Sequence, residues 1–317
     1  MSTLGPPTLL VTAAGTANGY GLLRSAREHQ PDVRLIAADT NRRELCAASS
    51  LCDLFVRTVG VDHESFREDL TTLVREEGVT AYIPIIDEEI SGAATFASAM
   101  NLSVVGLNEE GAKICFDKFS THQFLKELGI PTVETFSSDD PFDQMKNMNG
   151  QLIAKPRHGR GSLGFRLLDS PSDAARLDSD YVVQPRLSAP EFTVDAFLSG
   201  ETFRAVCRER IETKAGVCTK ARVFTDPALE CVVQVVGEAL SVRGAYCVQF
   251  MHDGHGNPLI TDVNPRPGAG TAMSGACGVD FLSAHVAEAL GRDPTRYLQP
   301  LGRQRYVLRV FSEIVTQ

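Results

Sequence analysis

Tryptophan is absent from this sequence and aromatic residues make up only 7% of it, so bulk in its cores must come from Phe, Leu, Ile and Val. Long apolar runs are also missing, since none approaches the length of a membrane span. The N-terminus lacks the basic and apolar segments of a secretion signal. These absences predict a cytoplasmic protein without a membrane partner.

An excess of positive charge is lacking too, because the formal net charge is -9. Binding along a nucleic-acid backbone needs a basic face, so we expect no nucleic-acid partner. A nucleotide pocket needs only a few local cations, and the net charge does not exclude one. No CxxC pair occurs among the eight cysteines, which favours buried thiols in a reducing compartment over a disulfide framework.

The length of 317 residues suggests two or three fused lobes rather than one core. In the first third, short apolar runs at 8–12, 35–38 and 81–86 alternate with helical patterns. The first run ends in a glycine-bearing turn at 15–21. This alternation predicts a doubly wound parallel sheet with helices on both faces.

A second unit opens with a helical pattern at Asp117 and Lys118. A strand at 151–155, a glycine-rich loop at 158–164 and a strand at 165–168 follow, and they predict a hairpin flap. A Walker A motif would instead have a strand, a loop and a helix. Further strand patterns predict a mainly antiparallel remainder, at 181–184, 191–197, 202–208, 217–224, 245–251 and 258–263.

Oxygen-bearing side chains gather on the last two predicted strands. If these strands pair, side-chain alternation puts Asp262 and Asn264 on one face, and Gln249 joins them from the neighbouring strand. One carboxylate and two amide oxygens suit magnesium, and Arg266 could reach a phosphoryl oxygen. The alternative is a plain β-turn, because Asn-Pro-Arg-Pro-Gly is strong turn chemistry with or without a metal.

Lysine and glycine supply the matching phosphate contacts. Lys155 ends a strand just before the flap, and Gly159 and Gly161 allow the flap backbone to approach a phosphate closely. The alternative for the flap is a flexible exposed hairpin. Lys118, taken alone, is better explained as a solvated helix residue.

Four pieces of the chain, in order and with family-like spacing, resemble the ATP-grasp superfamily, and most of all the subgroup similar to the carbamoyl-phosphate synthetase large chain. Together they cover nearly the whole chain. They are Asp117-Lys118, Ile153-Ala154-Lys155-Pro156 with the glycine flap, Gln184-Pro185-Arg186-Leu187 running on to 191–195, and Gln249 with Asp262-Val263-Asn264-Pro265-Arg266.

The resemblance implies an α/β and α+β chain: a Rossmann-like domain at 1–112, a small lobe with the flap at 113–183, and a lobe with the metal and phosphate site at 184–317. It implies ATP and Mg²⁺ as cofactors, with Mn²⁺ as a substitute. The implied catalytic residues are Arg266 and Lys155, and the implied metal ligands are Gln249, Asp262 and Asn264. The implied nucleotide contacts are Lys118, Lys155, Gly159, Gly161, Ser162, Gln184, Pro185, Arg186, Leu187 and Glu191.

Two positions depart from the family pattern. Asp262 stands where Glu is usual, so a shorter side chain must reach the metal. Pro185 stands where an acidic residue is common, and it lacks an N–H, although an adenine amino group mainly needs carbonyl acceptors.

Other residues have two readings each. Four cations are predicted on or between strands that face the cleft, where one or two could touch phosphate or an acidic substrate, yet each could equally be a solvated cation: Arg208, Arg210, Lys214 and Lys220. The loop 268–271 suits a substrate carboxylate or simply starts the next helix. Asp87, Glu88 and Glu89 follow a strand of the parallel sheet, where ligands of such folds bind, although helix capping is the commoner explanation of acidic residues there.

The predicted activity is an Mg-ATP-dependent carboxylate–amine ligase working through an acyl phosphate, of amino-acid or peptide type. Its partners would be a small carboxylate and an amine, and a homodimer is one assembly open to it. A full carbamoyl-phosphate synthetase is not expected from a chain of this size. Two rivals remain: a non-catalytic nucleotide-binding protein, and an NAD(P)-dependent oxidoreductase suggested by Asp39 about twenty residues after the first turn.

Overall fold

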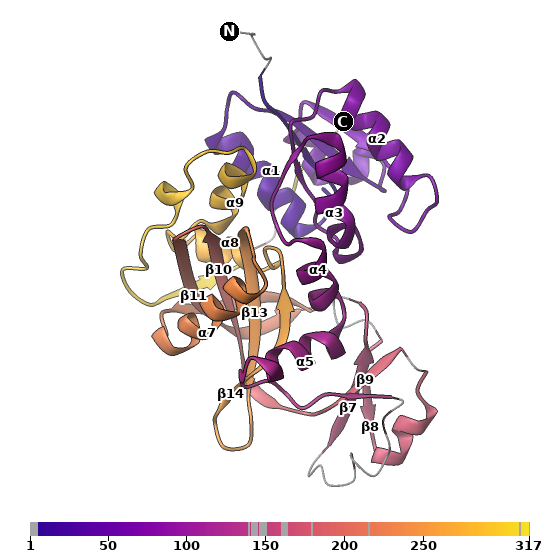
Figure 1. Ribbon diagram of the computed structural model, residues 1–317. Coiled ribbons are helices and arrows are strands. Elements are labelled where there is room, and N and C mark those ends of the chain that lie inside the picture. The colour runs from indigo at the N-terminus through magenta and orange to yellow at the C-terminus, as the bar shows by residue number, and fades with distance from the viewer. Residues whose placement is uncertain are drawn as a thin grey trace.

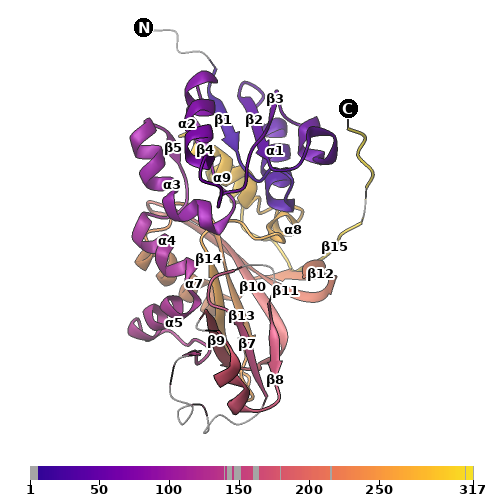
Figure 2. The same ribbon diagram turned by 90° about the vertical axis from the view of Figure 1, so that its right-hand side faces the viewer.

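The computed structural model describes residues 6–138, 140, 145, 151–159, 164–178, 180–214, 216–310 and 312–316. Within them the strands form one parallel and two antiparallel sheets. The parallel sheet lies at one end, the four-stranded sheet at the other and the six-stranded sheet between them (Figures 1 and 2). The predicted fold class, a doubly wound parallel sheet followed by two lobes, is confirmed.

The parallel sheet has the order β3-β2-β1-β4-β5. Its strands are β1 (Thr8–Val11), β2 (Arg34–Asp39), β3 (Leu54–Arg57), β4 (Ala81–Ile83) and β5 (Ser103–Val104). The helices of this region are α1 (Ala17–His29), α2 (Phe66–Glu76) and α3 (Asp87–Met100). The strand predicted at 81–86 ends at Ile83, because Pro84 has no N–H to continue the ladder.

Alternation along β1 divides the core of this sheet in two. Leu9 and Val11 pack with α1 on one face, whereas Leu10 packs with α2 and α3 on the other. The first face is also covered by α9 (Phe281–Ala289), which comes from the far end of the chain. All nine residues of α9 are buried, since its other side packs on β10 and β13.

Two consecutive helices, α4 (Glu109–Phe116) and α5 (Lys118–Glu127), run from the parallel sheet toward the small sheet (Figure 1). Asp117 separates them and caps α5 by accepting from the Phe119 N–H. The small antiparallel sheet has the order β6-β9-β7-β8. Its strands are β6 (Phe136–Ser137), β7 (Leu152–Pro156), β8 (Arg166–Leu168) and β9 (Tyr181–Pro185). The predicted hairpin is β7 paired with β8.

The six-stranded antiparallel sheet has the order β14-β13-β10-β11-β12-β15. Its strands are β10 (Ser188–Ser199), β11 (Thr202–Lys214), β12 (Val217–Phe224), β13 (Gly244–His252), β14 (Pro258–Asn264) and β15 (Arg305–Leu308). The other helices among the described residues are α7 (Pro227–Ala239) and α8 (Thr271–Gly275), with 3-10 turns at Arg43–Leu45, Ala47–Ser50, Pro171–Arg176 and Thr295–Tyr297. No helix among the described residues is long and apolar enough to cross a membrane.

Candidate functional site

A cavity of about 740 Å³ is lined by residues from the parallel-sheet region, α4, α5 and both antiparallel sheets. It brings together eleven of the residues singled out from the sequence, although these are far apart in the chain. They are Lys118, Lys155, Gly159, Gln184, Pro185, Leu187, Glu191, Gln249, Asp262, Asn264 and Arg266.

Three predicted nucleotide contacts stand apart. Arg186 is not among the cavity-lining residues: its N–H donates to the Gln151 carbonyl at 2.8 Å and its Nη1 to Gln151 Oε1 at 2.5 Å. Of the backbone groups of Arg186, the carbonyl is left for the predicted base contact. Gly161 and Ser162 lie outside the described residues, and their roles stay predictions.

The side chains predicted as oxygen ligands lie where strand alternation puts them. Asp262 and Asn264 are two residues apart on β14, and Asn264 Nδ2 donates to Asp262 Oδ2 at 3.0 Å, which leaves the amide oxygen for a cation. Gln249 lies directly opposite Asp262 in the β13–β14 register. The intervening Val263 belongs to the apolar core.

These three side chains fit magnesium better than a metal that needs several charged or soft ligands. Among the described residues no three His, Cys, Asp or Glu side chains are grouped to hold a metal ion. Magnesium commonly takes one or two carboxylates and completes its shell with phosphate and water oxygens. One carboxylate and two amides therefore suit a magnesium ion that arrives with a nucleotide.

Lys155 lies on β7, partly buried, with its Nζ 3.4 Å from the Thr261 carbonyl. Burial lowers the pKa of Lys155, Asp262 opposes this, and the nearby Lys118 lowers it further. The ammonium therefore lies between an acidic side chain and a second cation. Added negative charge, as from a phosphate, would relieve the repulsion between the two lysines.

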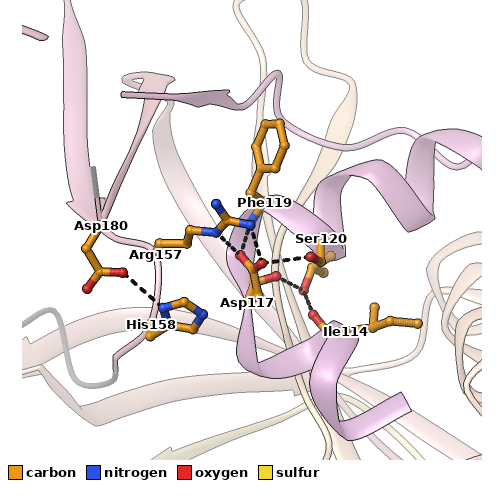
Figure 3. Close-up of polar contacts among 8 residues, drawn as sticks. Ile114, Asp117, Phe119, Ser120, Arg157, His158 and Asp180 are labelled. Carbon is orange, nitrogen blue, oxygen red and sulfur yellow. Dashed lines mark hydrogen bonds and ion pairs between the residues drawn. The ribbon is translucent and has the colours of Figure 1, made fainter. Parts of the chain in front are cut away.

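Lys118 connects α5 to the base of the flap. Its Nζ donates to the Gly159 carbonyl at 2.8 Å, and its N–H donates to the Arg157 carbonyl at 3.1 Å. Arg157 in turn donates from Nε and Nη2 to both carboxylate oxygens of Asp117, at 2.7 and 2.6 Å (Figure 3). Hydrogen bonds thus connect the start of α5 and residues 157–159 at the base of the flap into one unit.

Asp117 is the centre of that unit. Burial raises the pKa of its carboxyl, but hydrogen bonds from Arg157, Ser120 and the Phe119 N–H outweigh this and hold the pKa at about 2. On the other side of Arg157, His158 Nδ1 lies 3.0 Å from Asp180 Oδ1 (Figure 3). Arg157 and Asp180 were not singled out from the sequence, because the pattern of their own segments carries no sign of these partners.

Glu191 on β10 accepts a hydrogen bond from Arg210 on β11, and both line the cavity. Of the four cations predicted to face the cleft, only Arg210 does so. Arg208 is buried behind the cavity, while Lys214 and Lys220 are exposed and lie beside Glu212.

Arg266 forms hydrogen bonds with Asp87, which lies 179 positions earlier in the chain. Its Nε donates to Asp87 Oδ1 at 2.8 Å and its Nη2 to Asp87 Oδ2 at 3.3 Å. Burial lowers the pKa of Arg266, and the charge and hydrogen bonds of Asp87 more than offset this and raise it. Asp87 opens α3 at the carboxyl end of β4 and lines the cavity, so it does more than begin a helix.

The loop at 268–270 is supported by a network of hydrogen bonds around the buried Asp195. Asp195 is fully buried and accepts from Arg208 Nε at 2.9 Å, Thr271 Oγ1 at 2.9 Å and Ser274 Oγ at 2.7 Å. Gly270 lies so close to Arg208 that a Cβ would come within 2.4 Å of the guanidinium. Gly268 and Ala269 line the cavity, and Gly270 leads into α8; contact with a substrate carboxylate stays a prediction.

Asp39, the residue that suggested a dinucleotide site, is engaged by the backbone and by its neighbour. Its Oδ2 accepts from the Gly15 N–H at 2.7 Å and its Oδ1 from Asn41. A Cβ at Gly15 would lie 3.0 Å from that carboxylate. The Asp39 carboxylate is therefore used in hydrogen bonds within the protein and does not project toward a ribose.

The chain is similar to one family model, to curated enzymes and to solved structures. Residues 178–310 match a family model described as ATP-grasp in the biosynthetic pathway with Ter operon. A D-alanine–D-alanine ligase of Saccharophagus degradans is 25% identical over 186 residues, which are 51% of this chain and 59% of that ligase. The chain thus spans less than two thirds of that protein. A carbamoyl-phosphate synthase of Methanobrevibacter smithii is 22% identical over 70% of this chain and 67% of its own length.

Among solved structures, the biotin carboxylase domain dimer of Hydrogenobacter thermophilus 2-oxoglutarate carboxylase, in complex with MgADP, ADP and bicarbonate, has a TM-score of 0.78. It is 16% identical, and the match covers 94% of this chain and 73% of that one. At this identity the likeness shows the fold, and the arrangement of one parallel and two antiparallel sheets is shared.

Proposed function

Because this chain belongs to the ATP-grasp superfamily, we propose that it is an Mg-ATP-dependent ligase that activates a carboxylate as an acyl phosphate and joins it to an amine. One observation carries the proposal. A single cavity holds an oxygen ligand set, Asp262 with Asn264 and Gln249, together with the cations Lys155 and Arg266.

In this proposal the nucleotide lies between the small and the large sheet. The base occupies the part of the cavity lined by Ile153, Leu187 and Met251, and the triphosphate extends past Lys155 toward Asp262. Apolar walls suit a flat base, and cations suit phosphate oxygens. Glu191 holds the ribose hydroxyls, although it must share its carboxylate with Arg210.

Asp262, Asn264 and Gln249 would hold magnesium, which when bound neutralises phosphate charge. The residues themselves supply positioning. Lys155 and Arg266 bring positive charge to the γ-phosphate, and Asp87 orients Arg266 through two hydrogen bonds. The substrate carboxylate attacks the γ-phosphorus and ADP leaves; the amine then attacks the acyl carbon, loses a proton, and phosphate leaves.

An amino-acid or peptide-type substrate is supported by the similarity to D-alanine–D-alanine ligases, which join two amino acids by name. We assign the acceptor substrate to the part of the cavity that the loop at 268–270 lines. This loop follows Arg266 in the chain, and Asp195 supports it rigidly. The assembly proposed is a homodimer, in keeping with the dimer of the similar biotin carboxylase domain.

A non-catalytic nucleotide-binding protein is the second candidate. It is favoured by the single carboxylate in the ligand set, since Gln249 contributes no charge. ADP release distinguishes the two: a ligase releases ADP and phosphate only when a carboxylate and an amine are both present.

The test is a screen of carboxylates against amines for coupled release of ADP and phosphate, with mass spectrometry of the product. Asp262→Asn and Lys155→Ala should abolish turnover and leave the unfolding curve near that of the parent. Lys214→Ala, which removes an exposed lysine away from the cavity, is the matched control and should keep full activity. Near-normal turnover in both site variants would end the ligase assignment.

A further inference from the structure

Glu89 places a buried carboxyl in the first turn of α3, two residues after Asp87 and close to the carboxyl end of β4. The residue is 6% exposed, and each of its carboxylate oxygens accepts a hydrogen bond from a hydroxyl. Thr12, just after β1, donates from Oγ1 to Oε2 at 2.8 Å, and the Tyr82 hydroxyl of β4 donates to Oε1. One side chain therefore connects the start of α3 to two adjacent strands of the parallel sheet.

The same turn of α3 carries the carboxylate that orients Arg266. Asp87 accepts from Arg266 Nε and Nη2 at 2.8 and 3.3 Å and lines the 740 Å³ cavity. Glu89 does not line that cavity but a separate one of about 140 Å³. Its effect on the nucleotide site must therefore pass through the turn that it shares with Asp87.

The carboxyl of Glu89 changes its charge near neutral pH. Burial raises its pKa to about 7, and hydrogen bonds from Tyr82 and Thr12 and the charge of Arg67 oppose this only in part. No cation that the structure describes forms an ion pair with it. Burial and the neighbouring carboxylate also raise the pKa of Tyr82 well above its usual value, so the Tyr82 hydroxyl keeps its proton.

The other charged or titratable groups that surround Glu89 come from α2, from the segment before α2 and from α3 itself. They line the same 140 Å³ cavity: His63, Glu64, Arg67 and Glu88. The first three are exposed to solvent, so the cavity reaches the surface, and it is large enough to hold water. Glu89 can therefore exchange its proton with solvent although it is nearly buried.

The two protonation states of Glu89 hold the turn differently. When ionised, the carboxylate accepts a charge-assisted bond from each hydroxyl, and such bonds are about twice as strong as neutral ones. When protonated, it gains an O–H of its own, so either Thr12 or Tyr82 must accept instead of donate. The ionised form therefore ties the first turn of α3 more firmly to β1 and β4.

We propose that Glu89 is a positioning residue whose ionised carboxylate holds the α3 turn so that Asp87 directs Arg266 at the γ-phosphate, and whose protonation loosens this arrangement. The inference rests on the proposed function, which brings Arg266 to the γ-phosphate, and adds regulation of that site by pH. MgATP should thus bind better at high pH than at low pH. MgADP lacks the γ-phosphate and should respond far less.

The experiment measures the dissociation constants of MgATP and MgADP by calorimetry between pH 6 and 8.5. Their ratio isolates the γ-phosphate and needs no turnover. In the parent protein the preference for MgATP should rise about fivefold, the low end of coupling between linked groups, with a midpoint near pH 7. Glu89→Gln keeps the size of the side chain but does not titrate, so its preference should stay constant over this range.

Tyr82→Phe separates positioning from a purely structural role. It removes one donor to the carboxylate, which raises the pKa of Glu89, so the midpoint should move to higher pH by about one unit. Thr12→Val should move the midpoint in the same direction, and it decides the question if Tyr82→Phe does not fold. If folded variants unfold more easily but keep the parental midpoint, Glu89 is structural and the inference is overturned.

Thr95→Val is the matched control, because it removes another hydroxyl-to-carboxylate bond of α3, from Thr95 Oγ1 to Glu109 Oε2 on the exposed side. It should keep the parental pH dependence. His63→Gln removes the imidazole that lines the same cavity and should keep it too. A midpoint that is lost in His63→Gln and retained in Glu89→Gln overturns the inference.

Failure of this inference and failure of the proposed function have different signatures. A parent protein that prefers MgATP by a ratio that is constant from pH 6 to 8.5 loses the role of Glu89 but keeps its proposed nucleotide dependence. A parent protein that binds neither nucleotide loses both.

Discussion

Two arginine–aspartate pairs differ in their surroundings: one lines the cavity, and the other is buried outside its lining. The Arg208–Asp195 side chains are 3% and 0% exposed, lie within the large sheet and support the 268–270 loop from below. The Arg266–Asp87 side chains are 15% and 19% exposed and line the cavity itself. Similar chemistry therefore supports structure in one place and is available to a substrate in the other.

The buried pair should show the largest effect, and the effect should be on stability. Asp195→Asn removes the charge that compensates Arg208 and should lower the free energy of unfolding by about 3–5 kcal/mol, measured by urea denaturation. The double variant Asp195→Asn/Arg208→Met leaves no unpaired charge and should lose less than the sum of the two single variants. Additive losses would mean that the pair is not coupled.

The cavity pair should instead show its effect in turnover. Arg266→Met keeps side-chain length but removes the guanidinium from the proposed phosphoryl site, and kcat for ADP release should fall about 10²–10³-fold. Asp87→Asn keeps Arg266 and loosens its orientation, so a smaller loss of kcat is expected. If Arg266→Met mainly destabilises the fold and leaves kcat unchanged, the two pairs do not differ in the way described.

The sequence could predict the oxygen-bearing residues near the cavity pair, but it could predict neither arginine–aspartate pair. Strand alternation put Asp262 and Asn264 on one face with Gln249 beside them, because period-two geometry and a short β13–β14 connection determine that arrangement. The Asp87–Arg266 pair joins residues 179 positions apart, and nothing local to either marks the other. The buried helix α9 was not predicted for the same reason, because its second face packs on a sheet whose strands are far from it in the sequence.

A third pair, Arg157–Asp117, lies at the junction of α5 and the flap base, with side chains 30% and 12% exposed. The pKa of Asp117 in the folded protein, about 2, is below the usual value of 3.8 for an aspartate. Its stabilising contribution is therefore full above pH 4 and is lost as the pH falls through about 2. With solvent screening allowed for, the free energy of unfolding should fall by about 1–2 kcal/mol. Urea midpoints from pH 5 to 2 should fall less steeply for Asp117→Asn; parallel curves would contradict the prediction.

The smallest effect is expected at the exposed Lys220–Glu212 pair, where the Nζ–Oε2 distance is 2.9 Å and the side chains are 48% and 36% exposed. This contact is as short as those of the buried pair, but water solvates both groups and salt screens them, so forming it changes little. Lys220→Ala should leave the urea midpoint and kcat unchanged. A loss comparable to that of Asp195→Asn would mean that contact distance, rather than the solvent accessibility of the charges, governs how much each pair contributes.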